Sequence, residues 1–378
     1  MSGIYIHIPF CRQACTYCNF YFSTSLNQKS SFLDVLLQEI SLQNDFIDRS
    51  EGIETIYFGG GTPSLLKEEE LQIILETIHS HFRIEKKAEI TLEANPDDID
   101  KEKVKNWMRI GINRLSLGVQ SFNEEELRWM NRAHSAEQAG RSIDMILEAG
   151  MENVSADLIF GSPLLTDDAL IKNLSFITKK NIPHLSCYSL TVEPKTALQK
   201  MIEKKKSMPV DNEHQAKQFL LVMEHLAAEG YEQYEISNYA KQGFRSRHNS
   251  SYWKNKPYWG FGPSAHSFDG KNKRRWNVAH LPKYTEGLLS ENLVYEEENL
   301  SDLQLLNEYI MTALRTIEGI DLDHISKHFG EDKKQAIEKN TERFIRLKEI
   351  EKVNEYIYLT PSGKLLSDYI TAELFFVN

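Results

Sequence analysis

The stretch Ile4-Tyr5-Ile6-His7-Ile8-Pro9-Phe10-Cys11-Arg12-Gln13-Ala14-Cys15-Thr16-Tyr17-Cys18-Asn19-Phe20 decides the fold of this chain. Isoleucines alternate through its first part, which is typical of a β-strand, and Pro9 ends that pattern. Three cysteines then follow at short spacing: Cys11, Cys15 and Cys18. The stretch therefore predicts a strand that leads into a metal-binding loop.

The spacing of the three cysteines bears on which metal the loop would hold. Three thiolates can bind a soft metal or an iron–sulfur cluster. A structural zinc site usually has four Cys or His ligands, so Cys187 or His7 would have to complete it. A [4Fe–4S] cluster with three protein ligands keeps one iron free for another chelator. We expect the cluster, with zinc as the alternative.

The composition limits the class of protein. The chain has 378 residues, 41% of them hydrophobic, which is enough for one large core and a smaller domain. It carries 44 Lys and Arg against 55 Asp and Glu, and this net charge of −11 argues against a general nucleic-acid binder. The chain shows no signal peptide and no apolar run of membrane-spanning length, so we expect it in the cytoplasm.

Strand patterns and helix patterns alternate through the first part of the chain. Strands are predicted at residues 4–8, 54–58, 88–93, 114–119, 154–160 and 185–192. Helices are predicted at residues 30–49, 68–82, 101–110, 124–130, 136–149, 168–179 and 213–229. Such alternation predicts a parallel sheet with helices outside it. The pattern leaves open whether the sheet curls into a barrel.

Polar or small residues follow the predicted strands where each strand ends. They are Cys11, Gly60, Glu93, Gln120, Asp157 and the Ser186–Ser189 region. In barrels of parallel strands the site is built at the carboxyl ends, so we expect these residues to share one pocket.

The rest of the chain predicts two further regions. Residues 231–300 are rich in aromatic residues and less regular, and suggest a cap or linker. Residues 301–378 predict helices at 303–316, 322–329 and 333–347, a hairpin near 353–359 and a last helix from Ser362. This order resembles a winged helix, but its 10 Lys and Arg against 14 Asp and Glu favour a structural or docking role over DNA binding.

The cysteine spacing, with Tyr17 beside Cys18 and with Gly59-Gly60-Gly61-Thr62-Pro63 at a strand end, resembles the radical S-adenosylmethionine (SAM) superfamily. The resemblance implies an α/β fold in residues 1–230, an incomplete (β/α)6 radical SAM barrel, with the C-terminal helical, winged-helix-like domain beyond it. It also implies that SAM chelates the free iron of a [4Fe–4S] cluster.

The resemblance assigns roles around SAM to individual residues. Gly60, Gly61 and Thr62 would approach the methionine amine, and Glu93 would hold it as an ammonium. Arg132 would pair with the carboxylate. The remaining expected contacts are Gln120 and Asp157 to the ribose and Tyr5 beside the cluster. Each of these residues could also have an ordinary structural role.

Further motifs narrow the resemblance to the oxygen-independent coproporphyrinogen dehydrogenases (HemN) and the related heme chaperones (HemW). They are Ile6-His7-Ile8-Pro9-Phe10-Cys11, Leu117-Gly118-Val119-Gln120-Ser121-Phe122 and Asp157-Leu158-Ile159-Phe160-Gly161. The dehydrogenases have a fourth cysteine where this chain has Phe20. They also have an N-terminal extension, whereas this chain begins at the first strand. Both differences favour the chaperones.

His248-Asn249-Ser250-Ser251-Tyr252-Trp253 matches a motif of those chaperones. The resemblance implies heme as a third cofactor with His248 as an axial ligand, although such a histidine is also often structural. The expected partner is a membrane-associated respiratory protein that accepts heme, and a homodimer is allowed. A radical SAM coproporphyrinogen III dehydrogenase is the alternative function.

Overall fold

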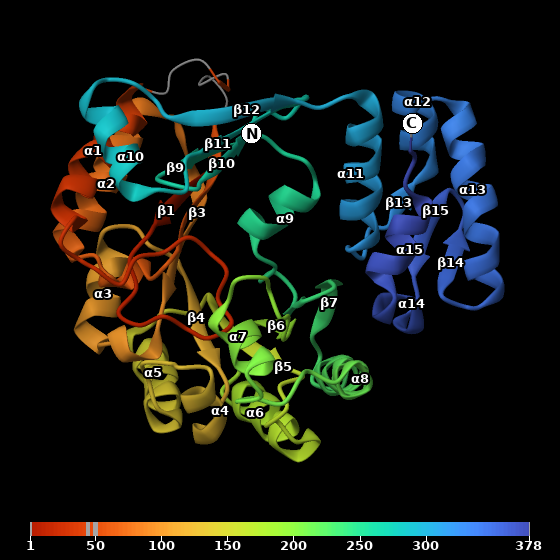
Figure 1. The fold of residues 1–378 in the computed structure, drawn as a ribbon, viewed down its shortest axis with the longest axis horizontal. Helices are drawn as coiled ribbons and strands as arrows, with labels where there is room; N and C mark the ends of the chain where they lie inside the picture. The colour runs from red at the N-terminus through yellow and green to blue at the C-terminus, as the bar shows by residue number, and fades with distance from the viewer. Residues whose placement is uncertain (1, 43–45, 48–51, 378) are drawn as a thin grey trace.

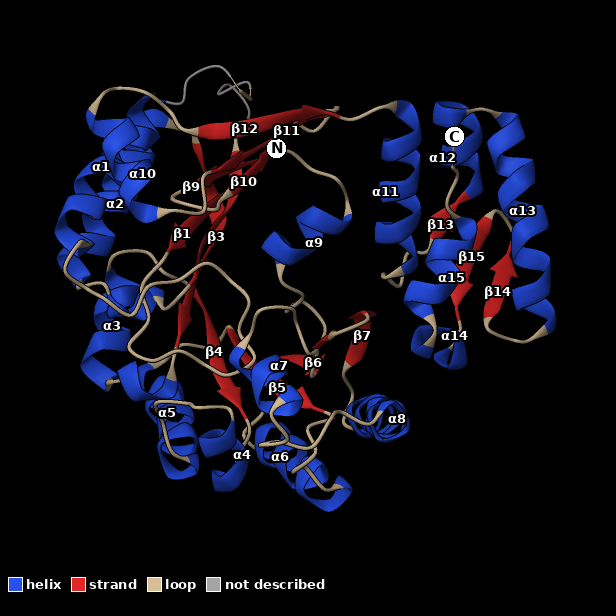
Figure 2. Cartoon of the chain, viewed as in Figure 1, coloured by secondary structure: helices blue, strands red, loops and turns tan. Residues whose placement is uncertain are grey.

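The computed structural model describes residues 2–42, 46–47 and 52–377. Its main element is a sheet of twelve strands in the order β12-β11-β10-β9-β1-β2-β3-β4-β5-β6-β8-β7. From β9 to β6 neighbouring strands run parallel, and the outer strands at both edges are antiparallel. Because this order is linear from β12 to β7, the sheet is an open, partial barrel (Figures 1 and 2).

The six strand-and-helix units are confirmed. The strands are β1 (Ser2–Ile8), β2 (Ile53–Gly60), β3 (Ile84–Ala94), β4 (Arg114–Gln120), β5 (Val154–Phe160) and β6 (His184–Ser189). The helices are α1 (Lys29–Leu42), α2 (Glu68–His81), α3 (Lys101–Arg109), α4 (Glu124–Trp129), α5 (Ala136–Ala149), α6 (Asp167–Lys179) and α8 (Asn212–Ala228). The predicted helix over residues 30–49 ends at Leu42, and part of its remainder lies outside the described residues. The short helix α7 (Ala197–Glu203) was not predicted.

The alternation in β1 separates the core from the interior of the partial barrel. Ile4, Ile6 and Ile8 are fully buried and belong to the core shared with α1. Tyr5 and His7 lie on the opposite face, because successive side chains of a strand point to opposite sides. The inner faces of β1 to β6 therefore carry polar and aromatic groups that can build a site.

Residues 231–300 are more regular than the aromatic-rich pattern indicates. They form strands β7 (Glu232–Glu235), β8 (Asn238–Ala240), β9 (Tyr258–Phe261), β10 (His266–Phe268), β11 (Lys273–Asn277) and β12 (Tyr295–Asn299), and helices α9 (Arg247–Trp253) and α10 (Leu281–Leu289). These strands extend both edges of the sheet, and β9 pairs in parallel with β1. Two short 3-10 helices, Pro63–Leu65 and Pro96–Asp98, follow β2 and β3.

The C-terminal region has its own core of buried apolar residues. It contains α11 (Asp302–Leu314), β13 (Ile320–Asp321), α12 (Leu322–Phe329), α13 (Glu331–Arg346), β14 (Ile350–Val353), β15 (Tyr356–Leu359), α14 (Pro361–Leu365) and α15 (Ser367–Leu374). Its strands form a separate sheet in the order β13-β15-β14. Helices beside a small hairpin sheet agree with the winged-helix-like prediction, and α11 faces α9 (Figure 1). In the described ranges no helix is long and apolar enough to cross a bilayer.

Candidate SAM and cluster site

A cavity of about 520 Å³ opens at the carboxyl ends of the parallel strands. Most of the predicted site residues line it: Cys11, Cys15, Cys18, Gly60, Gly61, Thr62, Glu93, Gln120, Arg132 and Asp157. Tyr5 and His248 are not among the lining residues. The structure therefore brings together side chains from the loop after β1, from β2 to β5, and from the turn before α5.

The three cysteines lie on the loop after β1 as free, half-buried thiols. The loop is held by backbone hydrogen bonds from Cys11 N to Ser23 O at 3.0 Å and from Thr16 N to Met130 O at 3.0 Å. Burial raises the pKa of Cys11 to about 11, partly offset by the Thr62 hydroxyl, which donates to its sulfur at 3.6 Å. Burial also raises the pKa of Cys18. Binding of a metal or cluster would displace these thiol protons.

The arrangement of the thiols fits a cluster better than a single zinc ion. Among the described residues, no group of three or more His, Cys, Asp or Glu is placed to hold one metal ion. In a [4Fe–4S] cluster each thiolate binds a different iron, so the thiols need not converge on one point. The half-buried thiols all border one cavity, as a cluster with an open iron requires.

The sequence places two aromatic residues, Tyr17 and Phe20, close to Cys18, where we expect them to shield a cluster from water. The structure exposes the two side chains to different degrees. Tyr17 is packed against the loop, where its hydroxyl lies 3.4 Å from Arg132 Nη1. Phe20 is 68% exposed and is one of the residues that line the cavity. The ring of Phe20 is therefore exposed to solvent in this structure.

The glycines at the end of β2 permit a close approach of two backbone segments. The segment that they approach in the structure is the end of β1 and the cysteine loop, whereas the resemblance implies an approach to the methionine amine of SAM. A Cβ atom on Gly61 would lie 2.6 Å from Phe10 O, and Gly61 N donates to Ile8 O at 2.8 Å. Thr62 N donates to Phe10 O at 2.7 Å. Gly60 has a φ of 106°, and a Cβ atom there would meet the His7 ring. These glycines join the loop to β2 and also border the cavity.

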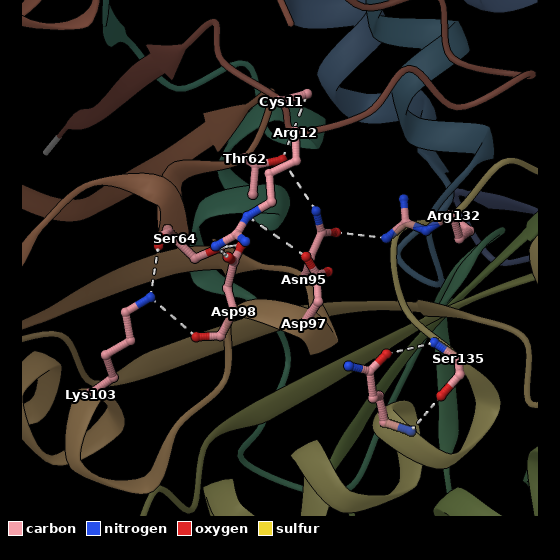
Figure 3. A network of polar contacts seen from close by, with 11 residues as sticks. Cys11, Arg12, Thr62, Ser64, Asn95, Asp97, Asp98, Lys103, Arg132 and Ser135 are labelled. Atoms are coloured by element: carbon pink, nitrogen blue, oxygen red, sulfur yellow. Dashed lines mark hydrogen bonds and ion pairs between the residues drawn. The ribbon is translucent and has the colours of Figure 1, made fainter. Parts of the chain in front are cut away.

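Arg132 connects the cysteine loop to the end of β3 and to β4. Figure 3 shows its contact with Asn95. Its Nη1 donates to Cys15 Sγ at 3.2 Å, and its Nη2 donates to Asn95 Oδ1 at 2.6 Å and to Gly118 O at 2.8 Å. Its Nε is buried and has no partner among the described residues. The guanidinium is thus fixed at the cavity wall with one donor left.

Carboxylates from β3 and β5 line the same cavity. Glu93 accepts a hydrogen bond from the Tyr57 hydroxyl at 2.8 Å, and burial raises its pKa to about 7 although this hydrogen bond opposes the shift. Asp157 accepts from Ser116 Oγ at 3.1 Å and Ser155 Oγ at 3.2 Å. Burial nevertheless raises the pKa of Asp157. Both groups can bind a cationic or hydroxyl-bearing ligand.

Gln120 ends β4 with an unusual backbone conformation. Its φ of 64° lies in the left-handed region, which turns the chain at the cavity edge. The register of β4 against β5 shifts between Leu117 and Gln120. This irregularity places Gln120 among the lining residues.

Sequence reasoning missed an ion-pair network behind the cysteine loop (Figure 3). Arg12 Nη2 donates to Asp98 Oδ1 at 2.6 Å, and Ser64 Oγ donates to Asp98 Oδ2 at 2.8 Å. Lys103 Nζ donates to the carbonyl oxygens of Asp98 and Ser64. Arg12, a cation inside the cysteine motif, could have indicated such a network. Its partner Asp98, however, lies 86 residues away in the sequence.

Tyr5 and His248 belong to a stack of rings on the interior face. Tyr57 stacks on Tyr5 at 6.2 Å and on His248 at 4.9 Å between ring centroids, and the hydroxyl of Tyr57 reaches Glu93 at the cavity. The hydroxyl of Tyr5 lies 3.1 Å from His7 Nδ1. Tyr5 thus does not line the cavity itself, but it contacts Tyr57, which binds Glu93 at the cavity.

His248 is 1% exposed, and both of its ring nitrogens are occupied. Nδ1 lies 2.8 Å from Thr55 Oγ1 and Nε2 lies 2.9 Å from the Tyr252 hydroxyl. Burial lowers the pKa of His248 to about 3, so the ring is neutral at neutral pH. Axial ligation of heme iron by this ring would require one of these contacts to break.

The sequence assigns no role to Cys187 and His266, and a buried structural position is the default expectation for both. Cys187 is buried as expected. His266 is exposed on β10 and stacks on Trp276, so the expectation that it is buried is wrong. Antiparallel strands such as β9 to β12 can have one face in solvent, and His266 lies on that face.

Two family descriptions match separate parts of the chain. Residues 5–177 match the radical SAM superfamily, and residues 300–366 match the HemN C-terminal domain. The solved structure of coproporphyrinogen III oxidase (HemN) from Escherichia coli superposes on this chain with a TM-score of 0.85. The superposition covers 99% of this chain and 89% of the HemN chain. At 22% sequence identity, it shows that the two proteins share a fold.

Curated relatives match the chain over nearly its full length. The heme chaperone HemW of Bacillus subtilis is 33% identical over 98% of both chains. The heme chaperone HemW of Mycobacterium tuberculosis is 32% identical over 98% of this chain and 94% of its own. The heme chaperone HemW of Escherichia coli is 32% identical over 84% and 83%, respectively. The chain therefore belongs to the HemW heme chaperone family, within the radical SAM superfamily.

Proposed function

We propose that this protein is a heme chaperone that carries a [4Fe–4S] cluster and SAM and delivers heme to a membrane-associated respiratory protein. The observation that carries the proposal is the match to heme chaperones over 98% of the chain. The cavity supports it, because three free thiols and a set of polar strand-end residues border one space.

The cofactors would use the cavity as follows. Cys11, Cys15 and Cys18 hold the cluster, and the cluster supplies an open iron and one electron. Glu93 faces the SAM amine, and Arg132, through its remaining donor, faces the carboxylate. Gln120 and Asp157 suit the ribose hydroxyls. Gly60, Gly61 and Thr62 form the floor between the loop and β2.

Tyr5 and His248 would act through the stacked rings. Tyr5 supports Tyr57, and Tyr57 donates to Glu93. His248 supports heme binding by orienting Tyr252, since its own nitrogens are both occupied. We keep His248 in the heme site as a positioning residue and expect its loss to weaken heme binding.

A heme titration tests the proposed function. Anaerobically reconstituted protein should bind one heme per chain, and His248→Ala should bind it more weakly. His79→Ala, on the exposed side of α2, is the matched control and should bind as the wild type does. Absence of stoichiometric heme binding by the folded wild type would refute the proposal.

The same preparation distinguishes the heme chaperone from the alternative, a coproporphyrinogen III dehydrogenase. The chaperone should leave coproporphyrinogen III unchanged in the presence of reductant and SAM. Decarboxylation of that substrate would identify a radical SAM dehydrogenase instead.

A further inference from the structure

A second cavity, of about 490 Å³, lies between the partial barrel and the C-terminal region. Its walls come from α9, from strands at both edges of the sheet, and from α11. They include Asn249, Tyr252 and Trp253 of α9 and Glu308, Met311, Thr312 and Arg315 of α11. We propose that this interdomain cavity binds the heme macrocycle and that Tyr188 couples it to the SAM cavity. The proposal rests on the proposed heme-binding function.

The walls suit a large planar ring. Tyr252, Trp253, Tyr258, Phe268 and Met311 present aromatic or thioether surface to the cavity. The volume is within the range of sites for ligands of this size. Polar and charged side chains, among them Asn238, Lys256 and Glu308, line the rest of the cavity. Trp253 also keeps a buried indole Nε1 without a partner among the described residues. Buried donors normally have a partner, so this one is available to a ligand or to water.

Two arginines line this cavity, and each is paired with a glutamate that lines it as well. Arg274 packs over Phe268 at 5.6 Å and is bidentate to Glu308 at 2.8 and 2.9 Å. Arg315 packs over Trp253 at 5.3 Å and pairs with Glu235. A guanidinium has five N–H donors, so each arginine keeps donors beyond those that its glutamate uses. Two such groups match a macrocycle that carries two propionates.

The buried histidine explains how α9 presents its aromatic residue to the cavity. His248 Nε2 contacts the Tyr252 hydroxyl one helical turn further along, and Nδ1 contacts Thr55 on β2. The Tyr252 ring also packs edge-on against Tyr258 at 4.7 Å. His248 therefore fixes Tyr252 from behind, while Tyr252 itself lines the cavity.

Tyr188 of β6 lines both cavities. It stands beside Ser189 and Leu190 on the SAM side and beside Glu235 and Asn238 on the interdomain side. Its side chain is 42% exposed, so it can shift without disturbing the core. A ligand that presses on this shared wall from one cavity changes the shape offered to the other. Because binding free energies are linked, heme and SAM must then change each other's affinity by the same factor.

Filling the interdomain cavity tests the location of the heme. Met311→Trp adds bulk from a position that is already 40% exposed, so folding should be retained. We expect at least a tenfold rise in the dissociation constant for heme. Met208→Trp is the matched control, because Met208 is 68% exposed and lines neither cavity. Unchanged heme affinity in folded Met311→Trp would overturn the location. Failure of the wild type to bind heme would instead overturn the proposed function.

Coupling is tested by titrating heme with and without SAM, and SAM with and without heme. We expect the two affinity ratios of the wild type to agree and to differ from one by at least fivefold, in the usual range of coupled sites. Tyr188→Ala should bring both ratios close to one while each ligand still binds. A wild-type ratio of one, or a ratio unaffected by Tyr188→Ala, would refute the coupling.

Discussion

Glu93 shows the cost of a buried carboxylate at the scale of one residue. Burial raises its pKa from 4.5 to about 7 in the folded protein, against the effect of the Tyr57 hydrogen bond. Between these two values the folded state binds more protons than the unfolded state. The stability of the protein therefore falls as the pH rises from about 4.5 to about 7, by at most about 3 kcal/mol.

Glu93→Gln should remove this cost because glutamine stays neutral and can still accept from Tyr57. At pH 8 the free energy of unfolding in urea should increase by up to about 3 kcal/mol, and at pH 5 it should change little. SAM binding should weaken in the same variant. Glu85→Gln, near the other end of β3, is the control and should show no such pH dependence. Equal effects of Glu93→Gln at pH 5 and pH 8 would contradict the raised pKa.

The sequence could predict those site residues whose chemistry and spacing are local. Cys11, Cys15 and Cys18 stand together, and Glu93 and Asp157 follow strand patterns. Asp98 was missed because its partner Arg12 lies on the cysteine loop, 86 residues away in the sequence, and only the fold brings the two near. Tyr188 lies in the predicted Ser186–Ser189 region, but its position between two cavities depends on the fold. His248 was identified by its motif, but its burial and its contact with Thr55 depend on β2, which lies 193 residues earlier.

At the scale of elements, the junction of the cysteine loop and β2 depends on the absence of a side chain at Gly61. A Cβ atom there would meet Phe10 O at 2.6 Å and Ile8 O at 2.8 Å, both of them backbone atoms. Backbone cannot rotate away, so Gly61→Ala should destabilise the protein by about 1–3 kcal/mol. It should also lower the iron content of the reconstituted protein, because the loop would move.

Gly140→Ala in α5 is the matched substitution. Its Cβ atom would meet only Phe176 Cζ at 3.4 Å, an ordinary contact. Alanine in a helix interior should stabilise by about 0.5–1 kcal/mol and leave the iron content unchanged. Similar losses of stability and iron in both variants, measured by urea unfolding and iron analysis, would show that the loop junction has no special role.

The regular elements of the first six units followed from hydrophobic periodicity, because each unit buries one helix face on one strand face. The strands of residues 231–300 did not. They are short, most of them pair antiparallel at the edges of the sheet, and β9 joins β1 through contacts that are distant in sequence. Some of their aromatic residues line a cavity and others pack in the core. The sequence of these strands therefore lacks the alternation of apolar and polar residues that predicts a strand.

At the scale of the whole molecule, an ion pair joins the partial barrel to the C-terminal region. Arg315, just after α11, donates to Glu235 Oε1 at 2.9 Å from Nη2, and the Glu235 side chain is only 1% exposed. The backbone adds a bond from Ile236 N to Arg315 O at 3.0 Å. Removing one member of a buried pair leaves the other charge uncompensated, which costs about 3–5 kcal/mol.

Arg315→Ala should therefore lower the free energy of unfolding by about 3 kcal/mol. It should also separate the unfolding of the C-terminal region from that of the barrel, visible as two transitions in urea. Arg346→Ala on exposed α13 is the control, since its pair with Glu342 is mostly exposed and should be worth less than 1 kcal/mol. A single unshifted transition in Arg315→Ala would mean that this ion pair does not join the two regions.

The central claim is that one chain carries a [4Fe–4S] cluster on its three thiols and heme at a separate site. Iron, sulfide and bound heme measured on one anaerobic, heme-loaded preparation test it most directly. The account predicts four non-heme iron and four sulfide ions per chain, lost together in a Cys11→Ser, Cys15→Ser, Cys18→Ser variant, with one heme per chain beside them. Zinc without sulfide, or a complete cluster with no bound heme, would contradict it.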